Sequence, residues 1–399
     1  MPSLSEKGKM MPASPIRKLA PFADQAKKSG IHIYHLNIGQ PDIETPYQFW
    51  DALKKIDRTV LEYSPSNGFE ETRNKYAAFF KKRYGTEITG EEVMITTGGS
   101  EALLFTLFSI LDMDDEIIIP EPLYANYIGF AKSGNIKVVP IPTDFENHFA
   151  LPSVASFEAK ITAKTKAILI CNPNNPTGYF YSKNELEQLE ILAIKYNLFL
   201  ICDEVYRDFI YDKDLEYTSI LSFPNLKDHA ILIDSLSKRF SVCGARMGMI
   251  ATRNKEVLAT ALKFGQQRLS PPTVEQLGAM ALFDVEENYF EKVNKEYKKR
   301  RDTLVEHLNK IDGVKCHTPG GAFYCIVQLP VKDADDFCRW MLSDFHYNQE
   351  TVMMAPASGF YATEGKGKNE VRIAYVLQSP EIIKAVKCLE EGLKKYLSK

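Results

Sequence analysis

The chain has 399 residues, of which 45% are hydrophobic and 25% charged, and its formal net charge is −3. This length predicts one large α/β domain with at least one smaller domain, and the composition is ordinary for a soluble globular enzyme. The small net charge gives no electrostatic reason to expect nucleic acid or an anionic membrane as a partner, and no apolar run is long enough to predict a membrane span.

The N-terminal segment and the cysteines indicate where the protein works. Residues 1–22 contain no apolar stretch that could act as a signal peptide. The seven cysteines are scattered and form no Cys-x-x-Cys pair, so we expect small buried hydrophobic residues rather than disulfides or metal ligands. No metal site is expected, and a cytoplasmic location fits best.

Strand-like and helix-like segments alternate through the middle of the chain. Helices are expected at 100–111, 124–134 and 183–197. Strands are expected at 92–97, 115–120, 166–171, 198–203, 230–235 and 248–252. Several of these strands are apolar throughout rather than alternating, which indicates burial on both faces by helices. A mostly parallel sheet is therefore predicted.

The pattern changes near residue 286, where a second domain is expected to begin. A long charged helix at 287–311 precedes a strand-like segment at 314–329, a helix at 333–345, a strand at 370–376 and a last helix. We predict three parts: an N-terminal segment (1–45) that joins the small domain, a large cofactor-binding domain (46–285) and a small α+β domain (286–399).

Polar side chains follow four of the apolar strands. The residues concerned are Gly99, Ser100, Asn175, Asp203, Tyr206, Ser235 and Lys238. Because sites in open α/β sheets lie just beyond the carboxyl ends of the strands, we expect these residues to converge on one edge.

Each of these residues also has an ordinary structural interpretation. Lys238 alone would be a solvated lysine, Asp203 could cap a turn, and Asn175 could belong only to a turn. Gly99 could form a tight turn rather than an anion cradle, and Arg246 could pair with any carboxylate. Their occurrence together, in this order, favours a functional site.

Six motifs carry a resemblance to a known family: YSPSNGFEETR, TTGGSEAL, CNPNNPTG, CDEVY, SLSKRFSVCGARMG and VRIAY. With them the chain resembles the class I/II aminotransferases of pyridoxal-phosphate fold type I, the aspartate-aminotransferase-like group. The resemblance implies a mostly parallel seven-stranded sheet flanked by helices and a smaller α+β domain. It also implies pyridoxal 5'-phosphate as cofactor and transfer of an amino group from an L-amino acid to a 2-oxo acid by a ping-pong mechanism, with 2-oxoglutarate as the usual acceptor.

The resemblance assigns the catalytic roles. Lys238 would form a Schiff base with the cofactor and, once displaced by substrate, carry the proton between Cα and C4′. Asp203 would keep the pyridine nitrogen protonated so that the ring accepts electrons. Tyr206 and Asn175 would donate hydrogen bonds to the ring oxygen.

The same resemblance assigns donors to the cofactor phosphate, a dianion that is costly to bury unpaired. Arg246 offers a charge-assisted fork, and Ser235 matches the family better than Ser237 as a hydroxyl donor. Gly99 and Ser100 would present backbone N–H groups at a helix N-terminus.

Substrate binding and assembly are implied in the same way. Arg372 matches the clamp on the substrate α-carboxylate, with Asn175 beside it and the backbone of Gly39 close to the same group. Tyr124 matches a ring that stacks on the cofactor. Tyr63 matches a tyrosine that reaches the phosphate of a partner subunit, which implies a homodimer with shared active sites.

The sequence does not select one substrate side chain. Some aspartate-preferring members carry a lysine where this chain has Ser100. Arg268 could bind a distal carboxylate or lie on the surface, and Arg239 matches no role and is expected to be structural or solvated. An aromatic-friendly pocket could use Tyr34, Tyr127, Phe323, Tyr324 and Phe360. The donor therefore stays open between aspartate and an aromatic amino acid.

Two alternative functions remain open. A β-lyase or a cyclising synthase of the same fold would use the same lysine, aspartate and arginines. A non-catalytic cofactor-binding sensor is a different class of function. It is disfavoured because such proteins usually carry a DNA-binding extension, and no spare basic N-terminal domain is expected here.

Overall fold

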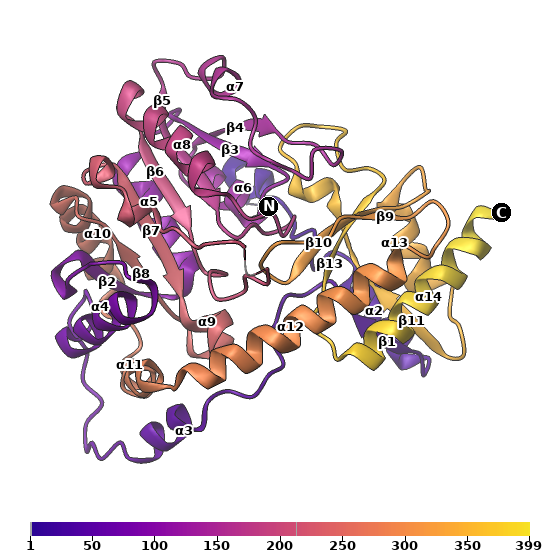
Figure 1. Cartoon of the computed structure of the whole chain (residues 1–399), viewed down its shortest axis with the longest axis horizontal. Coiled ribbons are helices and arrows are strands. Elements are labelled where there is room, and N and C mark those ends of the chain that lie inside the picture. Colours follow the sequence, from indigo (N-terminus) through magenta and orange to yellow (C-terminus); the bar gives the residue numbers. More distant parts are fainter. Residues whose placement is uncertain (1, 213) are drawn as a thin grey trace.

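A seven-stranded sheet organises the larger part of the molecule (Figure 1). The computed structural model of the chain describes residues 2–212 and 214–399. In spatial order the strands are β2 (Val93–Thr97), β8 (Met247–Ala251), β7 (Ala230–Ser235), β6 (Phe199–Asp203), β5 (Thr165–Cys171), β3 (Glu116–Glu121) and β4 (Lys137–Pro142). All neighbouring pairs from β7 to β4 are parallel, whereas β8 runs antiparallel to both β7 and β2.

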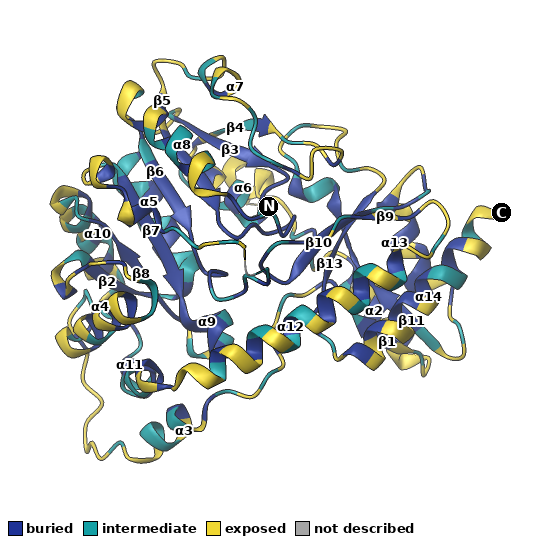
Figure 2. Cartoon of the chain, viewed as in Figure 1, coloured by how far each residue is buried: buried dark blue, intermediate teal, exposed yellow. Residues whose placement is uncertain are grey.

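Both faces of this sheet are covered, as the apolar strands predict. Along β5, Ala167 and Leu169 pack into one hydrophobic core and Ile168 and Ile170 into the other. The covering helices include α4 (Glu70–Tyr84), α5 (Gly98–Ile110), α6 (Asn126–Ser133), α8 (Lys183–Tyr196), α10 (Lys255–Arg268) and α11 (Thr273–Met280). Figure 2 shows the buried strands between helices whose outer faces are exposed.

A second, antiparallel sheet lies at the other end of the molecule. Its order is β12 (Ala355–Pro356), β13 (Glu370–Ala374), β10 (Tyr324–Gln328) and β9 (Lys315–Cys316). The long helix α12 (Glu287–Leu308) runs from the side of the large sheet to this region and packs against α14 (Ser379–Leu397) (Figure 1). The helix α13 (Ala334–Ser343) belongs to the same region.

The N-terminal segment is attached to this second region. Its strand β1 (His32–His35) pairs in parallel with β11 (Glu350–Met353), and its helix α2 (Ala20–Lys28) contacts α13. In the described parts of the chain, the remaining helices are α1 (Glu6–Met10), α3 (Tyr47–Lys54), α7 (Val154–Glu158) and α9 (Leu236–Arg239), together with six short 3-10 turns. Within the described residues, no helix combines the length and the apolar character needed to cross a membrane.

The predicted fold class is confirmed: a mostly parallel seven-stranded sheet with flanking helices is accompanied by a smaller α+β region. One strand of the seven-stranded sheet, β4, is absent from the predicted set. Its sequence KVVPIP contains two prolines, which argue against a strand in the interior of a sheet. The strand lies at the sheet edge, where it pairs only with β3 and a missing N–H is tolerated.

Candidate active site

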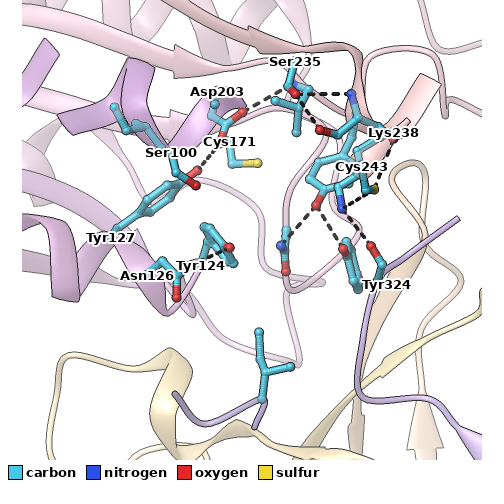
Figure 3. A pocket seen from close by; sticks show the side chains of 18 of the residues that line it. Ser100, Tyr124, Asn126, Tyr127, Cys171, Asp203, Ser235, Lys238, Cys243 and Tyr324 are labelled. Atoms are coloured by element: carbon cyan, nitrogen blue, oxygen red, sulfur yellow. Dashed lines mark hydrogen bonds between the residues drawn. The ribbon is translucent and has the colours of Figure 1, made fainter. Parts of the chain in front are cut away.

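A cavity of about 600 Å³ lies at the carboxyl ends of the parallel strands. The predicted residues that line it are Gly39, Gly99, Ser100, Tyr124, Asn175, Asp203, Tyr206, Ser235, Ser237, Lys238, Arg246 and Arg372. The segments after β2, β5, β6 and β7 thus meet at one edge, and β13 brings the arginine from the second sheet. Figure 3 shows part of this lining, with Asp203, Ser235 and Lys238 on the same side of the cavity.

Lys238 is a part-buried amine with no acidic partner within 4.0 Å among the described residues. It lies in the single-turn helix α9, which Ser235 caps by accepting a hydrogen bond from the Ser237 N–H. Its Nζ donates to the Gly39 carbonyl oxygen at 2.8 Å (Figure 3). Burial lowers the pKa of Lys238, and the positive charges of Arg372 and Arg246 lower it further. These features favour the neutral amine, which is the nucleophilic form.

Asp203 ends β6 and has no cation within 4.0 Å among the residues that the structure describes. Its Oδ2 accepts a hydrogen bond from the Tyr127 hydroxyl at 2.8 Å, and its Oδ1 accepts one from the Val205 N–H at 3.3 Å. Burial raises its pKa to about 6. A protonated nitrogen that lies against this carboxylate would stabilise its charged form.

One end of the cavity collects donors for an anion. Arg246 reaches over the first turn of α5, where Gly98 adopts φ +77°, and a Cβ there would lie 2.5 Å from Arg246 Nη2. The absence of that Cβ leaves room for the guanidinium beside the helix N-terminus, whose N–H groups have no intrahelical acceptors. Ser235 and Ser237 add two hydroxyl groups, 2.9 Å apart. The arrangement fits a phosphate.

Arg372 is a fully buried cation that lacks an acid within 4.0 Å in the described chain. It is 1% exposed on β13, and its Nη1 donates to Asn175 Oδ1 at 3.1 Å and its Nη2 to the Asn37 carbonyl oxygen at 2.6 Å. Its Nε has no partner among the described residues, and burial lowers its pKa. A buried charge without a counter-ion is costly, and an anionic ligand would supply the missing counter-charge. This side chain is therefore suited to bind an anion.

Two tyrosines and an amide lie between these groups. The hydroxyls of Tyr206 and Tyr324 are 3.0 Å apart, and Asn175 Nδ2 donates to the Tyr206 hydroxyl at 3.4 Å. Burial raises the pKa of Tyr206, so its hydroxyl stays protonated and can donate. A Cβ at Gly39 would overlap the Tyr324 hydroxyl, which explains the glycine at this close approach.

Some predicted residues lie elsewhere. Tyr63 is 78% exposed and lines no part of this cavity. Arg268 pairs with Glu101 of its own chain at 3.5 Å and donates to the Ser66 carbonyl oxygen. Of the five aromatic candidates, Tyr127 and Tyr324 line the cavity, whereas the others are packed in hydrophobic cores.

Arg239, the neighbour of Lys238, is fully buried in a set of paired charges. We call this set the ion cluster; it consists of Arg83, Glu204, Arg207, Asp208, Asp234 and Arg239. Arg239 lies 2.6 Å from Asp234 and 3.1 Å from Asp208. Burial alone would lower the pKa of Arg239, but these carboxylates and Tyr84 raise it. Of the two expected roles, structural and solvated, only the structural one agrees with this burial.

Sequence reasoning missed several residues of the cavity. Ser14, Ile16 and Arg17 come from the N-terminal segment, which carries no motif. Cys243 also lines the cavity and lies 3.9 Å from Lys238 Nζ (Figure 3). The sequence indicates Tyr127 only as part of an aromatic pocket, although its position three residues after Tyr124, at the start of a short helix, could have pointed to the cavity.

Comparisons with known proteins agree with this geometry. The sequence model of the family "Aminotransferase class I and II" matches residues 31–389. The chain is 30% identical to an aspartate aminotransferase of Pyrococcus horikoshii, across 98% of this chain and 97% of the relative. It is 32% identical to aromatic-amino-acid aminotransferase 2 of Thermococcus litoralis, across 98% of both chains.

Solved structures give the same result. The fold matches that of an aspartate aminotransferase from Thermotoga maritima with a TM-score of 0.89 at 29% identity, covering 98% of this chain and all of the other. An alanine aminotransferase from Pyrococcus furiosus matches with a TM-score of 0.89 at 30% identity and the same coverage. The chain therefore belongs to the class I and II aminotransferases and is a pyridoxal-phosphate-dependent enzyme of fold type I.

Proposed function

We propose that the cavity takes an L-amino acid by its amino and carboxylate groups and passes the amino group to 2-oxoglutarate. The observation that supports this most directly is a pair of cavity cations, the part-buried Lys238 and the buried Arg372, each without a carboxylate within 4.0 Å in the described part of the chain. An amine of lowered pKa suits covalent chemistry on a carbonyl, and a buried guanidinium suits a carboxylate.

The cofactor fits the donor set around the cavity. Arg246, Ser235 and the first N–H groups of α5 would hold its phosphate, and Asp203 would face its ring nitrogen. Tyr124 would lie along its ring, and Tyr206 with Asn175 would donate to its ring oxygen. When bound, pyridoxal phosphate supplies a carbonyl that condenses with amines and a ring that accepts the electrons released at the substrate Cα.

Proton movement would depend on two groups of this chain. Burial lowers the pKa of Lys238, so its Nζ could take a proton from the substrate Cα and return it at C4′ of the cofactor. Asp203 would hold its carboxylate against a ring N–H, an arrangement that also removes the cost of burying it without a cation. Tyr127 orients that carboxylate by its 2.8 Å hydrogen bond.

The substrate carboxylate would lie on Arg372. Asn175 accepts from Arg372 and donates toward Tyr206, so one amide connects the carboxylate site to the cofactor site. Aspartate and aromatic amino acids are the donors to test first, because relatives named for both classes are similarly close to this chain.

We also propose that the working unit is a homodimer. Tyr63 lies on a surface segment that includes other exposed apolar side chains: Tyr47, Trp50, Val60 and Leu61. Exposed apolar residues gathered in one stretch of chain are typical of a protein interface. In a second copy seated there, Tyr63 would be free to reach the phosphate end of the partner cavity.

A donor screen tests the proposed function. The purified enzyme, loaded with pyridoxal phosphate, is mixed with 2-oxoglutarate and each common L-amino acid in turn, and glutamate formation is measured. We expect glutamate from aspartate or from an aromatic amino acid. Release of pyruvate and ammonia without glutamate would instead assign a β-lyase, and binding of amino acids without turnover would assign a sensor.

A further inference from the structure

Cys243 contacts the amine that the proposed function uses, yet that function assigns no role to its thiol. Its Sγ lies 3.9 Å from Lys238 Nζ, and both side chains line the cavity (Figure 3). Lys238 belongs to α9, and Cys243 begins the short 3-10 turn Cys243–Ala245 in the same connection between β7 and β8. Cys243 is part-buried, so a small molecule that enters the cavity can reach its sulfur.

The fold holds the thiol and the amine side by side. The Cys243 thiol donates to the Ser237 carbonyl oxygen at 3.3 Å, and the Cys243 carbonyl oxygen accepts from Arg246 Nη1 at 3.1 Å. Lys238 Nζ is directed to the same part of the cavity by its bond to the Gly39 carbonyl oxygen. Because a lysine side chain has several rotatable bonds, Nζ can move the remaining distance to the sulfur without a change in the backbone.

The amine of this pair is suited to act as a nucleophile. Lys238 has no acidic partner within 4.0 Å among the described residues, so no adjacent carboxylate stabilises its charged form. Burial lowers the pKa of Lys238, and the charges of Arg372 and Arg246 lower it further. These features favour the neutral amine, which can attack an electrophilic sulfur as well as a carbonyl.

An amine, rather than a second thiol, lies beside Cys243 in the described chain. The cysteines are free, and Cys171, which also lines the cavity, donates to the Pro173 carbonyl oxygen at 3.3 Å. Oxidised cysteine sulfur condenses with nitrogen as well as with thiols. An oxidised Cys243 would therefore meet Lys238 Nζ as its neighbouring nucleophile.

We propose that Cys243 and Lys238 form an oxidation-sensitive site, in which a peroxide drives formation of a covalent Sγ–Nζ bond that a free thiol reverses. The proposal rests on the proposed function in one respect, namely that Lys238 Nζ has to be free to bind the cofactor. A chain that carries this bond takes up no cofactor until it is reduced. A chain whose Nζ is already bonded to the cofactor is protected.

The bond forms in two steps. The Cys243 sulfur first attacks hydrogen peroxide: an S–O bond forms, the O–O bond breaks and water leaves, so the sulfur is oxidised and the peroxide is reduced. The Nζ lone pair then attacks this sulfur, the S–O bond breaks, and the hydroxide leaves as water with a proton from the nitrogen. Two molecules of a small thiol reverse the bond and return the cysteine and the amine, while the small thiol is oxidised to its disulfide.

Peptide mass spectrometry tests the proposal directly. The cofactor-free protein is treated with hydrogen peroxide, its remaining thiols are blocked, and it is digested with trypsin in the absence of a reductant. Trypsin cleaves after Arg239 and Arg246 but not after a blocked Lys238. We expect peptides 228–239 and 240–246 as one linked species, lighter than their sum by two hydrogen atoms, which separates after treatment with dithiothreitol.

Two controls distinguish this bond from general cysteine oxidation. Cys171→Ala, a matched change at another thiol of the cavity, should give as much of the linked species as the wild type. Wild-type protein loaded with pyridoxal phosphate before the peroxide is added should give almost none. The proposal is overturned if peroxide converts Cys243 to a sulfinic or sulfonic acid and leaves Lys238 free, or if the loaded protein forms the link as readily as the cofactor-free protein.

Uptake of the cofactor gives a second readout that needs no turnover. Peroxide should abolish the absorbance change that accompanies binding of pyridoxal phosphate to the wild type, and dithiothreitol should restore it. Cys243→Ser and Cys243→Ala should each retain, after peroxide, the uptake that they show before it. An equal loss in these variants, or a loss that dithiothreitol does not reverse, contradicts the proposal. If the wild-type enzyme transfers no amino group at all, the proposed function fails, but the linked peptides still decide whether Cys243 and Lys238 react.

Discussion

Lys238 and Arg239 are adjacent on one helical turn, yet their side chains enter two regions of opposite character. Lys238 faces the cavity, where neither it nor the buried Arg372 has a carboxylate within 4.0 Å in the described chain. Arg239 enters the ion cluster, where Asp234 and Asp208 lie within 3.1 Å of it. Arg239 is fully buried and Lys238 partly buried, and the main difference is whether the counter-charge belongs to the chain.

This difference separates charges that stabilise the fold from charges that are paired only when a ligand is bound. In the ion cluster each buried arginine is compensated by carboxylates, so removing one partner leaves an uncompensated buried charge. In the cavity the cost of unpaired cations is already present in the ligand-free protein. Mutations in the cavity should therefore change activity more than stability, and mutations in the cluster should do the opposite.

Lys238→Ala should give the largest effect. We expect kcat to fall by about 10⁴-fold or more, because both the covalent amine and the proton carrier are lost. The thermal midpoint of the cofactor-free protein should not fall, since a poorly solvated amine is removed. Steady-state transfer assays and thermal unfolding measure the two quantities, with the exposed Lys263→Ala as control. Substantial activity in Lys238→Ala would refute the assignment.

Arg239→Met tests the other region. Losing this cation while Asp234 and Asp208 stay buried should cost about 3–5 kcal/mol in the free energy of unfolding. Urea unfolding of the cofactor-free protein measures this loss. Variant protein that still folds should bind pyridoxal phosphate, because Arg239 does not line the cavity. A stability equal to that of the wild type would mean that the ion cluster does not hold the fold.

Arg372→Leu should weaken the productive binding of substrate without lowering the stability of the fold. We expect kcat/KM to fall about 10²-fold, the loss of a charge-assisted bidentate contact. The unfolding midpoint of the cofactor-free protein should stay equal or rise, because the unpaired buried cation is gone. Arg372→Lys should restore part of the activity. A large loss of stability with unchanged KM would place Arg372 among the structural charges instead.

Asp203→Asn should change how the free energy of unfolding depends on pH, because the Asp203 carboxylate has no cationic partner within 4.0 Å among the described residues. Burial raises the pKa of Asp203 to about 6 from 3.8, so the folded protein holds this proton more tightly than the unfolded chain. That contribution to stability is present at pH 4 and is lost as the pH rises to 7. The stability of Asp203→Asn relative to wild type, both without cofactor, should therefore increase by roughly 2 kcal/mol over this range. The exposed Asp312→Asn should show no such trend in denaturant unfolding.

Tyr63→Phe should give the smallest effect and tests whether a second copy completes the cavity. Loss of one hydrogen bond to a phosphate should weaken pyridoxal phosphate about tenfold. Tyr47→Phe, which removes a hydroxyl from another exposed tyrosine, should leave the affinity unchanged. Analytical ultracentrifugation should show dimers for all three proteins. A monomeric wild-type enzyme with full affinity would exclude a shared site.

The strands and most of the cavity could be predicted because their signals are local. An apolar strand followed by a polar turn specifies where a side chain lies relative to the sheet, and four such turns point to one edge. The strand β4 could not be recognised, since its prolines argue against a strand when propensity is the only guide. The assignment of residues 1–45, 46–285 and 286–399 to domains stays a prediction.

Other residues depend on contacts between distant parts of the chain. Arg239 could not be assigned because its partners lie 5 and 31 positions away along the sequence and only the fold brings them together. Arg17 lies in an N-terminal segment without any motif, and nothing in the local sequence shows that it faces the cavity. The role of Tyr63 stays a prediction, because its proposed contact lies in another copy of the chain.

The antiparallel course of β8 has a consequence for how tightly a ligand is held. Because β7 leaves the sheet at the same edge where β8 enters, Lys238 and Arg246 belong to one short connection, which begins with α9. A ligand that binds Lys238 and Arg246 is held at two points by one segment of chain. When one end of the ligand is bound, its other end is therefore at a high effective concentration near the second residue. Cutting the chain between Lys238 and Arg246 would leave the strands in place, but it would lower the affinity for a ligand that contacts both residues.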